Sequence, residues 1–364
     1  MTTSPISVSL PDKPSGKRWN HVRCDSNADV QVAFGMPDQY TRSFHEAYAR
    51  ENWCFLANFT LRSGVASPVS QRFKAHCALM LCSFLWGVTF VVVKDALIDI
   101  SVFGYLAARF VLGALPMIWI YRKDLRKLTR EEAWAGIRVG LFMFGGYSFQ
   151  TAGIALTTAS KAAFITGLSV VLVPVFLAAF WRKKIGGWAW CGAAGSFAGL
   201  YFLTVPNQGF TELNRGDLLV MGCAVLYAFQ IIFLSRYSGK YSLGVLSCFQ
   251  VILAGVLSSI AIPILNLTGL EHFFVRYTVQ MEFGVIVTAI FTTAIAYPLL
   301  VWAQRHTTAT NTALILTAEP VFAAITSFLV LHERLGARAL AGAILILGGI
   351  CIAEWKGAIP SAGA

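Results

Sequence analysis

Charged residues are scarce in this sequence. Asp, Glu, Lys and Arg make up 13% of its 364 residues, whereas apolar residues make up 56%. Soluble domains usually contain about 25% charged residues. Between residues 76 and 356, apolar runs with few charges follow one another, and most match the roughly 20 residues that cross a bilayer as a helix. The composition therefore excludes an ordinary soluble domain and predicts an integral membrane protein.

The motifs of several enzyme and metal-binding classes are also missing. The eight cysteines show no C-x-x-C spacing, so neither a redox pair nor a zinc pair is indicated. His332-Glu333 lacks the second histidine of H-E-x-x-H, and the sequence around Ser148 does not complete G-x-S-x-G. A G-x-x-x-x-G-K-[ST] phosphate loop is absent too, which argues against a mechanism driven by ATP. We predict no cofactor, no metal site and no catalytic residue.

The net charge of +11 does not indicate a nucleic-acid partner. The basic residues lie in the N-terminal segment and in short loops between apolar runs, where anionic lipid head groups are nearer partners. We therefore predict the lipid bilayer as a partner and no nucleic acid.

Ten apolar runs are long enough to be membrane spans. They cover residues 76–94, 101–121, 136–157, 161–181, 185–205, 216–235, 241–268, 281–304, 308–331 and 335–355. Each should be helical, because lipid offers no hydrogen-bond partner to an open backbone. The predicted fold is an all-α integral membrane protein with ten transmembrane helices.

The second half of the chain repeats the first. The segment from Thr157 to Tyr201 aligns without a gap with the segment from Thr307 to Cys351, at a constant offset of 150 residues. Each copy contains five predicted spans, and an odd number of spans requires the second copy to enter the membrane from the opposite side. We therefore predict two inverted five-helix repeats, 76–205 and 215–356. Internal repeats in an apolar chain are typical of secondary transporters.

Residues 1–75 differ from the rest of the chain. They mix Pro, Ser, Asn and charges of both signs, and they contain no apolar run long enough for a span or a signal sequence. We predict that this N-terminal extension is either disordered or the result of a mistaken upstream start site.

Loop charges predict the orientation in the membrane. If the N-terminus is inside, the cytoplasmic loops and C-terminus hold thirteen basic residues: Arg122, Lys123, Arg126, Lys127, Arg130, Arg138, Arg182, Lys183, Lys184, Arg236, Lys240, Arg305 and Lys356. The external loops then hold six: Lys94, Lys161, Arg215, Arg276, Arg334 and Arg338. The positive-inside rule therefore places both termini of this multi-pass protein in the cytoplasm, and we expect the inner cell membrane.

Several segments resemble a known family. They are L-W-G at Leu85–Gly87, A-R-F at Ala108–Phe110, TTASKAAFITGLSVVLVP from Thr157, AEPVFAAITSFLVLHERL from Ala318 and GAILILGGICIAE from Gly342. Together, over about residues 76–356, they resemble the EamA family of the drug/metabolite transporter superfamily. The resemblance implies ten helices in two inverted repeats, and the transport, usually export, of small metabolites such as amino acids. It implies no particular substrate.

Glu319 is the first candidate for a functional residue, because an ionisable carboxyl deep in an apolar span is costly unless it is paired, protonated or hydrated. The following Pro320 removes a helix hydrogen bond, so the freed carbonyl and the carboxyl could bind a proton or a cationic group. The alternative is a buried Glu that caps a kink or pairs with another span. In the first repeat the equivalent residues are Ser169 and Val170. We include Ser169 among the cavity residues and predict hinges at Pro320 and Pro174.

Arg109 lies in the middle of the second span, too deep for its side chain to reach the interface easily. It therefore needs an anion, a carbonyl group or water as a partner. It could pair with Glu319 in a structural salt bridge, or it could bind a substrate carboxylate. The sequence leaves these alternatives open.

Other polar and aromatic residues at apolar depth are weaker candidates. Trp86 of the first span and Tyr227 of the sixth could be stacking walls of a cavity, or could simply pack. Lys161 and Asn311 occupy equivalent positions after a Thr-Thr-Ala turn, where helix capping is the alternative to substrate contact. We include Gln150 among the cavity residues. For this amide, the alternative is a hydrogen bond between helices, and the same alternative applies to the other polar residues at apolar depth, Tyr147, Thr166, Gln230, Gln250 and Tyr297.

We therefore predict a permease of a small metabolite, such as an amino acid, with a cavity between the two halves. Proton coupling is the favoured mechanism, because Glu319 can titrate and no sodium site is evident. The alternatives are a flippase of lipid-linked intermediates and, less favoured, an integral membrane enzyme or scaffold. The sequence leaves the substrate, the direction and the oligomeric state open.

Overall fold

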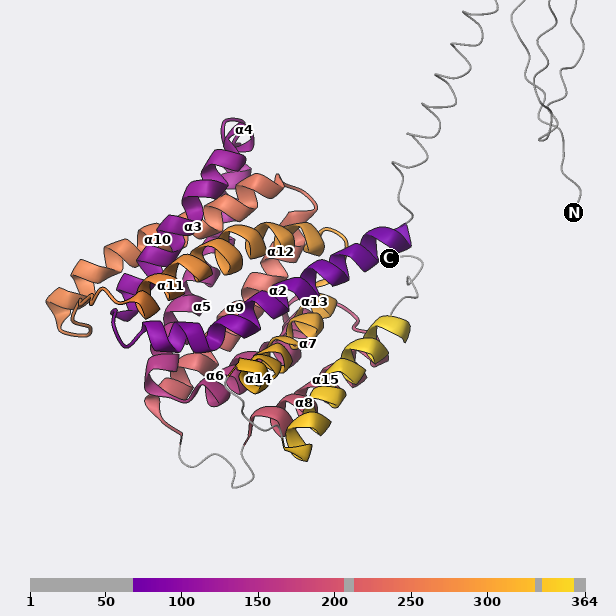
Figure 1. Ribbon diagram of the computed structural model, residues 1–364. Helices are drawn as coiled ribbons and strands as arrows, with labels where there is room; N and C mark the ends of the chain where they lie inside the picture. The colour runs from indigo at the N-terminus through magenta and orange to yellow at the C-terminus, as the bar shows by residue number, and fades with distance from the viewer. Residues whose placement is uncertain (1–67, 206–212, 331–335, 357–364) are drawn as a thin grey trace, which may run out of the picture. The chain divides into compact units, whose positions relative to one another are not determined.

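The computed structural model describes residues 68–205, 213–330 and 336–356, and in these ranges the regular structure is helical apart from one isolated bridge between Ile100 and Val275. In chain order the helices are α2 (Pro68–Ala96), α3 (Val102–Ile120), α4 (Arg122–Leu125), α5 (Arg130–Leu156), α6 (Ala159–Gly167), α7 (Ser169–Trp181), α8 (Gly187–Thr204), α9 (Arg215–Ser238), α10 (Leu243–Thr268), α11 (Val279–Val287), the π-helix η1 (Thr288–Ile295), α12 (Ala296–Gln304), α13 (Ala309–Leu316), α14 (Glu319–Val330) and α15 (Ala337–Lys356) (Figure 1).

Among the described residues, eight helical stretches are long and apolar enough to cross a membrane. They coincide with eight of the ten predicted spans, and they make this a multi-pass membrane protein. The predicted spans 185–205 and 308–331 are not among the eight. In the first, glycines and two tryptophans lower the mean hydropathy of α8, and in the second, a break after Leu316 divides the span into α13 and α14.

Two predictions lie partly outside the described residues. The structure describes the predicted N-terminal extension, 1–75, only from residue 68. The segment 331–335, which contains His332-Glu333, is also outside them.

Threonine and asparagine side chains begin several helices. Thr158 accepts a hydrogen bond from the backbone N–H of Lys161 at the start of α6, and Thr308 does the same for Asn311 at the start of α13. Asn214 forms a capping box at the start of α9. Each cap satisfies a backbone donor that the helix itself leaves without a partner.

Two spans are broken in the middle. α6 ends at Gly167 and α7 begins at Ser169, whereas α13 ends at Leu316 and α14 begins at Glu319. Pro320 explains part of the second break, because it has no N–H to donate to the carbonyl of Leu316. The first break has no proline beside it. Pro174, the predicted hinge of this span, lies inside α7.

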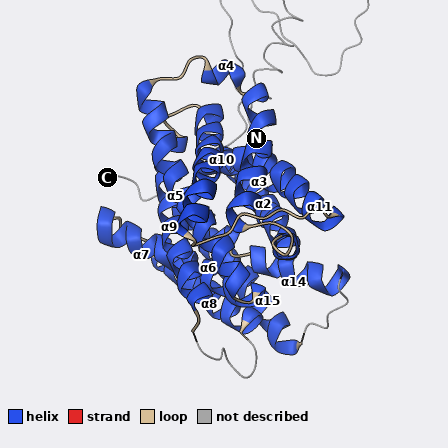
Figure 2. Ribbon diagram, turned by 90° about the vertical axis from the view of Figure 1, so that its left-hand side faces the viewer, coloured by secondary structure: helices blue, strands red, loops and turns tan. Residues whose placement is uncertain are grey.

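The helices pack in a few close pairs. α8 lies along α15, and α5 packs against α9 and α10, while α3 packs against α10 and η1 (Figure 2). α2 packs against α12, α13 and α14, and α9 packs against α6 and α7. Glycines allow the closest approach: a Cβ atom on Gly199 would lie 2.6 Å from the carbonyl oxygen of Gly342, and one on Gly192 would lie 2.7 Å from that of Gly349. α8 and α15 are therefore antiparallel.

Candidate functional site

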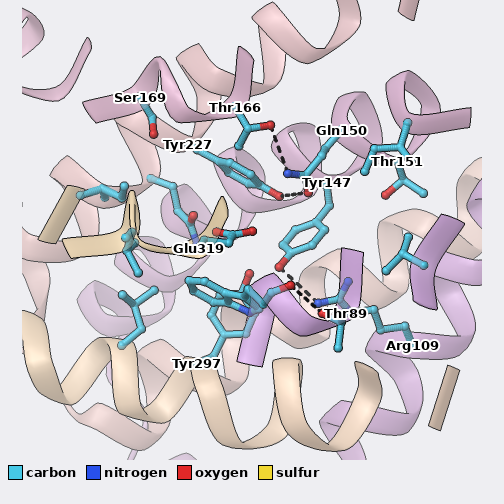
Figure 3. A pocket seen from close by; sticks show the side chains of 17 residues that line it. Thr89, Arg109, Tyr147, Gln150, Thr151, Thr166, Ser169, Tyr227, Tyr297 and Glu319 are labelled. Carbon is cyan, nitrogen blue, oxygen red and sulfur yellow. Dashed lines mark hydrogen bonds between the residues drawn. The ribbon is translucent and has the colours of Figure 1, made fainter. Parts of the chain in front are cut away.

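A cavity of about 100 Å³ lies among the broken spans and the helices packed on them (Figure 3). Its walls come from helices throughout the chain, from α2 to α14. Its lining residues are Trp86, Thr89, Val93, Arg109, Tyr147, Gln150, Thr151, Ile154, Thr166, Ser169, Tyr227, Gln230, Ile231, Tyr297, Leu300, Leu316 and Glu319. Six of the eight predicted cavity residues are in this set: Glu319, Arg109, Trp86, Tyr227, Gln150 and Ser169.

Glu319 is the first residue of α14, and its side chain lies among the lining residues (Figure 3). Within the described part of the chain, its carboxylate has no hydrogen-bond or ion-pair partner. The backbone around it is tightly packed, because a Cβ atom on Gly87 would collide with the carbonyl oxygen of Glu319 and lie 3.1 Å from the backbone nitrogen of Ala323. The glycine of the L-W-G segment thus lets α2 rest directly on the start of α14.

Arg109 is 4% exposed and is held by hydroxyl groups. Its Nε donates to Thr293 Oγ1 at 3.1 Å, and its Nη2 donates to Thr292 Oγ1 at 2.8 Å. Nη2 also donates to the hydroxyl of Tyr147 at 3.3 Å, and the guanidinium lies 4.7 Å from the centre of the Tyr147 ring. The salt bridge with Glu319 that the sequence allowed is therefore not formed, because the arginine is bound by hydroxyl and aromatic groups instead.

The π-helix η1 supplies most of these contacts. It places Thr288, Thr292 and Thr293 in full burial on the side that faces α2 and α3. The backbone carbonyl of Thr292 accepts a hydrogen bond from the indole Nε1 of Trp86 at 3.0 Å, and Thr288 Oγ1 accepts one from the hydroxyl of Tyr105 at 2.9 Å. π-Helical turns are rare and often occur at functional sites. η1 was not predicted, and its only visible signal is the pair of threonines in an apolar run.

Aromatic rings form a wall of the cavity. Trp86 lies 5.9 Å from Tyr297, and Tyr147 lies 5.5 Å from Tyr227 and 6.5 Å from Tyr297, measured between ring centroids. The hydroxyl of Tyr227 donates to Gln150 Oε1 at 3.0 Å. The cavity therefore combines flat apolar faces with hydroxyl and amide groups, as sites for small amphipathic ligands commonly do.

Lys161 and Asn311, the other two predicted cavity residues, lie elsewhere. Lys161 Nζ forms an ion pair with Asp217 Oδ2 at 2.9 Å. Asp217 is fully buried and also accepts a hydrogen bond from Thr157 Oγ1 at 2.6 Å. Asn311 is buried within α13. Asp217 was not predicted as a functional residue, although its place three residues after Asn214 matches a capping box.

Taken together, the lining residues can bind a small molecule of mixed polarity. Glu319 offers a free carboxylate to a proton or a cationic group, whereas Arg109 carries a fixed positive charge whose Nε and Nη2 already donate to hydroxyl groups. The tyrosine and tryptophan rings attract cations over their faces. The Glu319 carboxylate is therefore the clearest place in the cavity for a positively charged ligand group to bind.

Comparison with known proteins agrees with this description. The chain is 32% identical to an uncharacterized transporter of Archaeoglobus fulgidus, over 86% of this chain and 96% of that protein. It is 23% identical to the uncharacterized transporter YvbV of Bacillus subtilis, over 79% of this chain and 94% of that protein. A crystal structure with 17% sequence identity has the same fold, with a TM-score of 0.65 over 78% of this chain and 96% of that one.

The family itself is identified twice along the chain. The sequence profile of the EamA-like transporter family matches residues 73–205 and again residues 214–355. The two matches together cover most of the chain, and they include every residue that lines the cavity. This membrane protein therefore belongs to the EamA-like transporter family.

Proposed function

We propose that the protein is a secondary transporter that exports a small metabolite with an amino group, such as an amino acid or a related compound. The observation that carries this proposal is the unpartnered carboxylate of Glu319 in a buried, aromatic-walled cavity. A charged carboxylate at this depth is costly, so a proton or a substrate ammonium group that neutralises it is bound favourably. Only one of the two can occupy it at a time, which couples substrate movement to proton movement in the opposite direction.

Arg109 adds a second element of selection. Its fixed positive charge lies on the wall of the same cavity, so a zwitterion that turns its carboxylate toward Arg109 and its ammonium group toward Glu319 matches both charges. The cavity volume of about 100 Å³ suits a molecule of this kind. A lipid-linked intermediate is far larger, so the volume argues against a flippase.

The proposed architecture is ten transmembrane helices in two inverted repeats, 76–205 and 215–356. Three observations support it. The family profile matches twice, at 73–205 and 214–355. The two broken spans are interrupted at equivalent positions, Leu168 and Ala318, given the offset of 150. Equivalent helices also have equivalent neighbours: α2 packs on α13 and α14 as α9 packs on α6 and α7.

The α8–α15 pair supports the same proposal in more detail. Gly192 and Gly199 of α8 are equivalent to Gly342 and Gly349 of α15. Gly192 packs against Gly349, and Gly199 packs against Gly342. Between them, the Ser196 hydroxyl donates to the carbonyl of Ile346, its equivalent, at 3.5 Å. A twofold axis through this point would produce these contacts. With both termini in the cytoplasm, as the loop charges favour, the protein would lie in the inner membrane.

Transport by purified protein in liposomes tests the proposal. We expect a pooled set of labelled amino acids and amines to include a substrate whose accumulation follows an imposed proton gradient. Glu319→Gln should abolish this accumulation, because the amide neither takes up a proton nor carries a charge. Glu282→Gln, on the exposed first turn of α11, is the matched control and should behave as the unmodified protein does.

Either of two results would refute the mechanism. Accumulation that is unchanged in Glu319→Gln would remove this carboxylate as the coupling site. Formation of a chemically altered product by detergent-solubilised protein, where there are no two sides, would favour the enzyme alternative instead.

A further inference from the structure

Two polar clusters outside the cavity have no role in the site described so far. The first, which we name the Thr157 latch, consists of Thr157, Lys161 and Asp217, with Lys94 attached. Asp217 binds both Thr157 Oγ1, at 2.6 Å, and Lys161 Nζ, at 2.9 Å. Lys94 Nζ donates to the backbone carbonyl of Thr157 at 3.3 Å. The cluster therefore joins the α5–α6 turn to the start of α9 and the end of α2.

The second cluster, the Thr307 latch, consists of Arg72, His76, Thr307 and Glu354. Glu354 Oε2 lies 3.2 Å from Arg72 Nη2 and 3.3 Å from His76 Nδ1. The other ring nitrogen of His76, Nε2, lies 3.2 Å from Thr307 Oγ1. This cluster joins the start of α2 to the α12–α13 turn and the end of α15.

The two latches lie at opposite ends of the helices around the cavity. Both include side chains of α2, His76 in one and Lys94 in the other, and these residues are 18 positions apart. At 1.5 Å per residue the separation is about 27 Å, close to the thickness of the hydrocarbon core of a bilayer. Val93, next to Lys94, and Ile154, one turn before Thr157, line the cavity. The Thr157 latch thus lies next to one end of the cavity.

The latches are also equivalent within the duplicated sequence. Thr157 and Thr307 occupy the same position at an offset of 150 residues. In one latch the start of α9 is bound to the α5–α6 turn, and in the other the start of α2 is bound to the α12–α13 turn. Each latch therefore joins the first helix of one family match to the turn in the middle of the other match.

We propose that these clusters are the two gates of the transport cycle: one opens while the other stays closed, and in this structure the bonds of both clusters are formed. The inference rests on the proposed function, since only a transporter needs access to its site from two sides in turn. The latches also differ in burial. Asp217 is fully buried, whereas the Arg72, His76 and Glu354 side chains are 31%, 18% and 21% exposed. Solvent weakens exposed ion pairs, so the Thr307 latch opens first.

Labelling of a cavity thiol from each side of the membrane tests the gates directly. The background is a version in which all eight cysteines are replaced by serine or alanine, with Thr151→Cys as the reporter in the cavity wall. A membrane-impermeant thiol reagent is applied to intact cells and, separately, to inverted membrane vesicles. Asp217→Asn should speed labelling about tenfold from one side only, and Glu354→Gln should do so from the opposite side only.

The control is Asp99→Asn. Asp99 forms an ion pair with Arg276 at 3.5 Å. Asp99 lies in the loop between α2 and α3, so this pair is at the same end of α2 as the Thr157 latch but is not part of it. Its removal should leave labelling unchanged on both sides.

The swapped pair Lys161→Asp with Asp217→Lys should restore slow labelling. If Asp217→Asn does not fold, as judged by size-exclusion chromatography, Thr157→Ala removes one latch bond and should shift labelling in the same direction.

Labelling that rises equally from both sides, rises from the same side in both variants, or does not change would overturn the gate assignment. The assay needs no substrate, so its result is independent of the substrate proposal. Side-specific labelling without any transport of amino compounds would keep the gates and reject the substrate class. Proton-driven transport without side-specific labelling would keep the function and reject these gates.

Discussion

Replacing Gly113 with alanine tests how the π-helix η1 positions Arg109. Gly113 is on α3, one turn after Arg109, and faces η1. A Cβ atom there would lie 2.8 Å from Thr293 Cγ2 and 2.9 Å from the carbonyl oxygen of Ala289. Ordinary contacts begin at 3.4 Å, so η1 has to move away from α3 by about 0.6 Å, the difference between 3.4 and 2.8 Å. Thr293 is the acceptor of Arg109 Nε, at 3.1 Å, so this movement stretches that bond.

The expected cost follows from three terms. Overpacking of a filled interface destabilises by about 1–3 kcal/mol. The weakened bond to a charged donor adds about 1 kcal/mol. Alanine is the better helix former by about 1 kcal/mol, which offsets part of this. We expect a net loss of about 1–3 kcal/mol in Gly113→Ala, a lower unfolding temperature, and slower transport because Arg109 is no longer fixed.

Thermal unfolding in detergent, followed by tryptophan fluorescence, is the measurement. Gly195→Ala is the matched control, because the nearest atom to its Cβ is 3.8 Å away, and it should be neutral or stabilising by up to about 1 kcal/mol. Thr293→Ser removes the Cγ2 atom and keeps the hydroxyl, so the double variant with Gly113→Ala should recover part of the stability. Equal stability of Gly113→Ala and Gly195→Ala, or no recovery in the double variant, would refute the reasoning.

Two further predictions concern single contacts. Thr292→Val removes one acceptor of Arg109 but keeps the backbone carbonyl that binds the Trp86 indole, so we expect a loss of about 1 kcal/mol in thermal unfolding, whereas Thr292→Ser should retain the stability. Burial raises the pKa of Glu271, whose carboxylate accepts the backbone N–H of Val102 at the start of α3. The folded protein therefore binds this proton more tightly than the unfolded chain does. Its contribution to stability is full below about pH 4.3 and is lost as the pH rises through the folded pKa. Unfolding temperatures from about pH 4 to pH 7 should fall less in Glu271→Gln than in the unmodified protein, and an identical pH dependence would contradict this assignment.

The sequence predicted the membrane class and the position of most helices, because hydropathy over about 20 residues depends on composition alone. It also pointed to the break at Glu319-Pro320, since proline removes a backbone donor. The corresponding break at Leu168 was not predicted, because no residue there forbids a helix. Pro174, the other predicted hinge, lies inside α7 without breaking it, and its role as a hinge stays a prediction. A proline in a span is therefore a poor guide to a break unless neighbouring helices also favour one.

The site was predictable in its residue types but not in its contacts. Polar and charged residues at apolar depth are unfavourable unless they have partners, and most of those singled out from the sequence line the cavity. Which residues pair depends on helix rotation and spacing, and these depend on packing between distant segments. Arg109 consequently binds Thr292 and Thr293 of an unpredicted π-helix, and Lys161 binds Asp217 instead of a substrate.

In the proposed duplication the two halves supply similar walls, but the charges in the cavity are not duplicated. Ser169 and Glu319 begin the second parts of the two broken spans and line the same cavity, yet only one of them is acidic. Two carboxylates in about 100 Å³ would repel each other, and one of them would hold a proton permanently. A single carboxylate can instead exchange its proton for a substrate cation in every cycle. The departure from symmetry at Ser169 is thus a requirement of the proposed coupling, whereas Thr157 and Thr307, in the two proposed gates, are the same residue at equivalent positions.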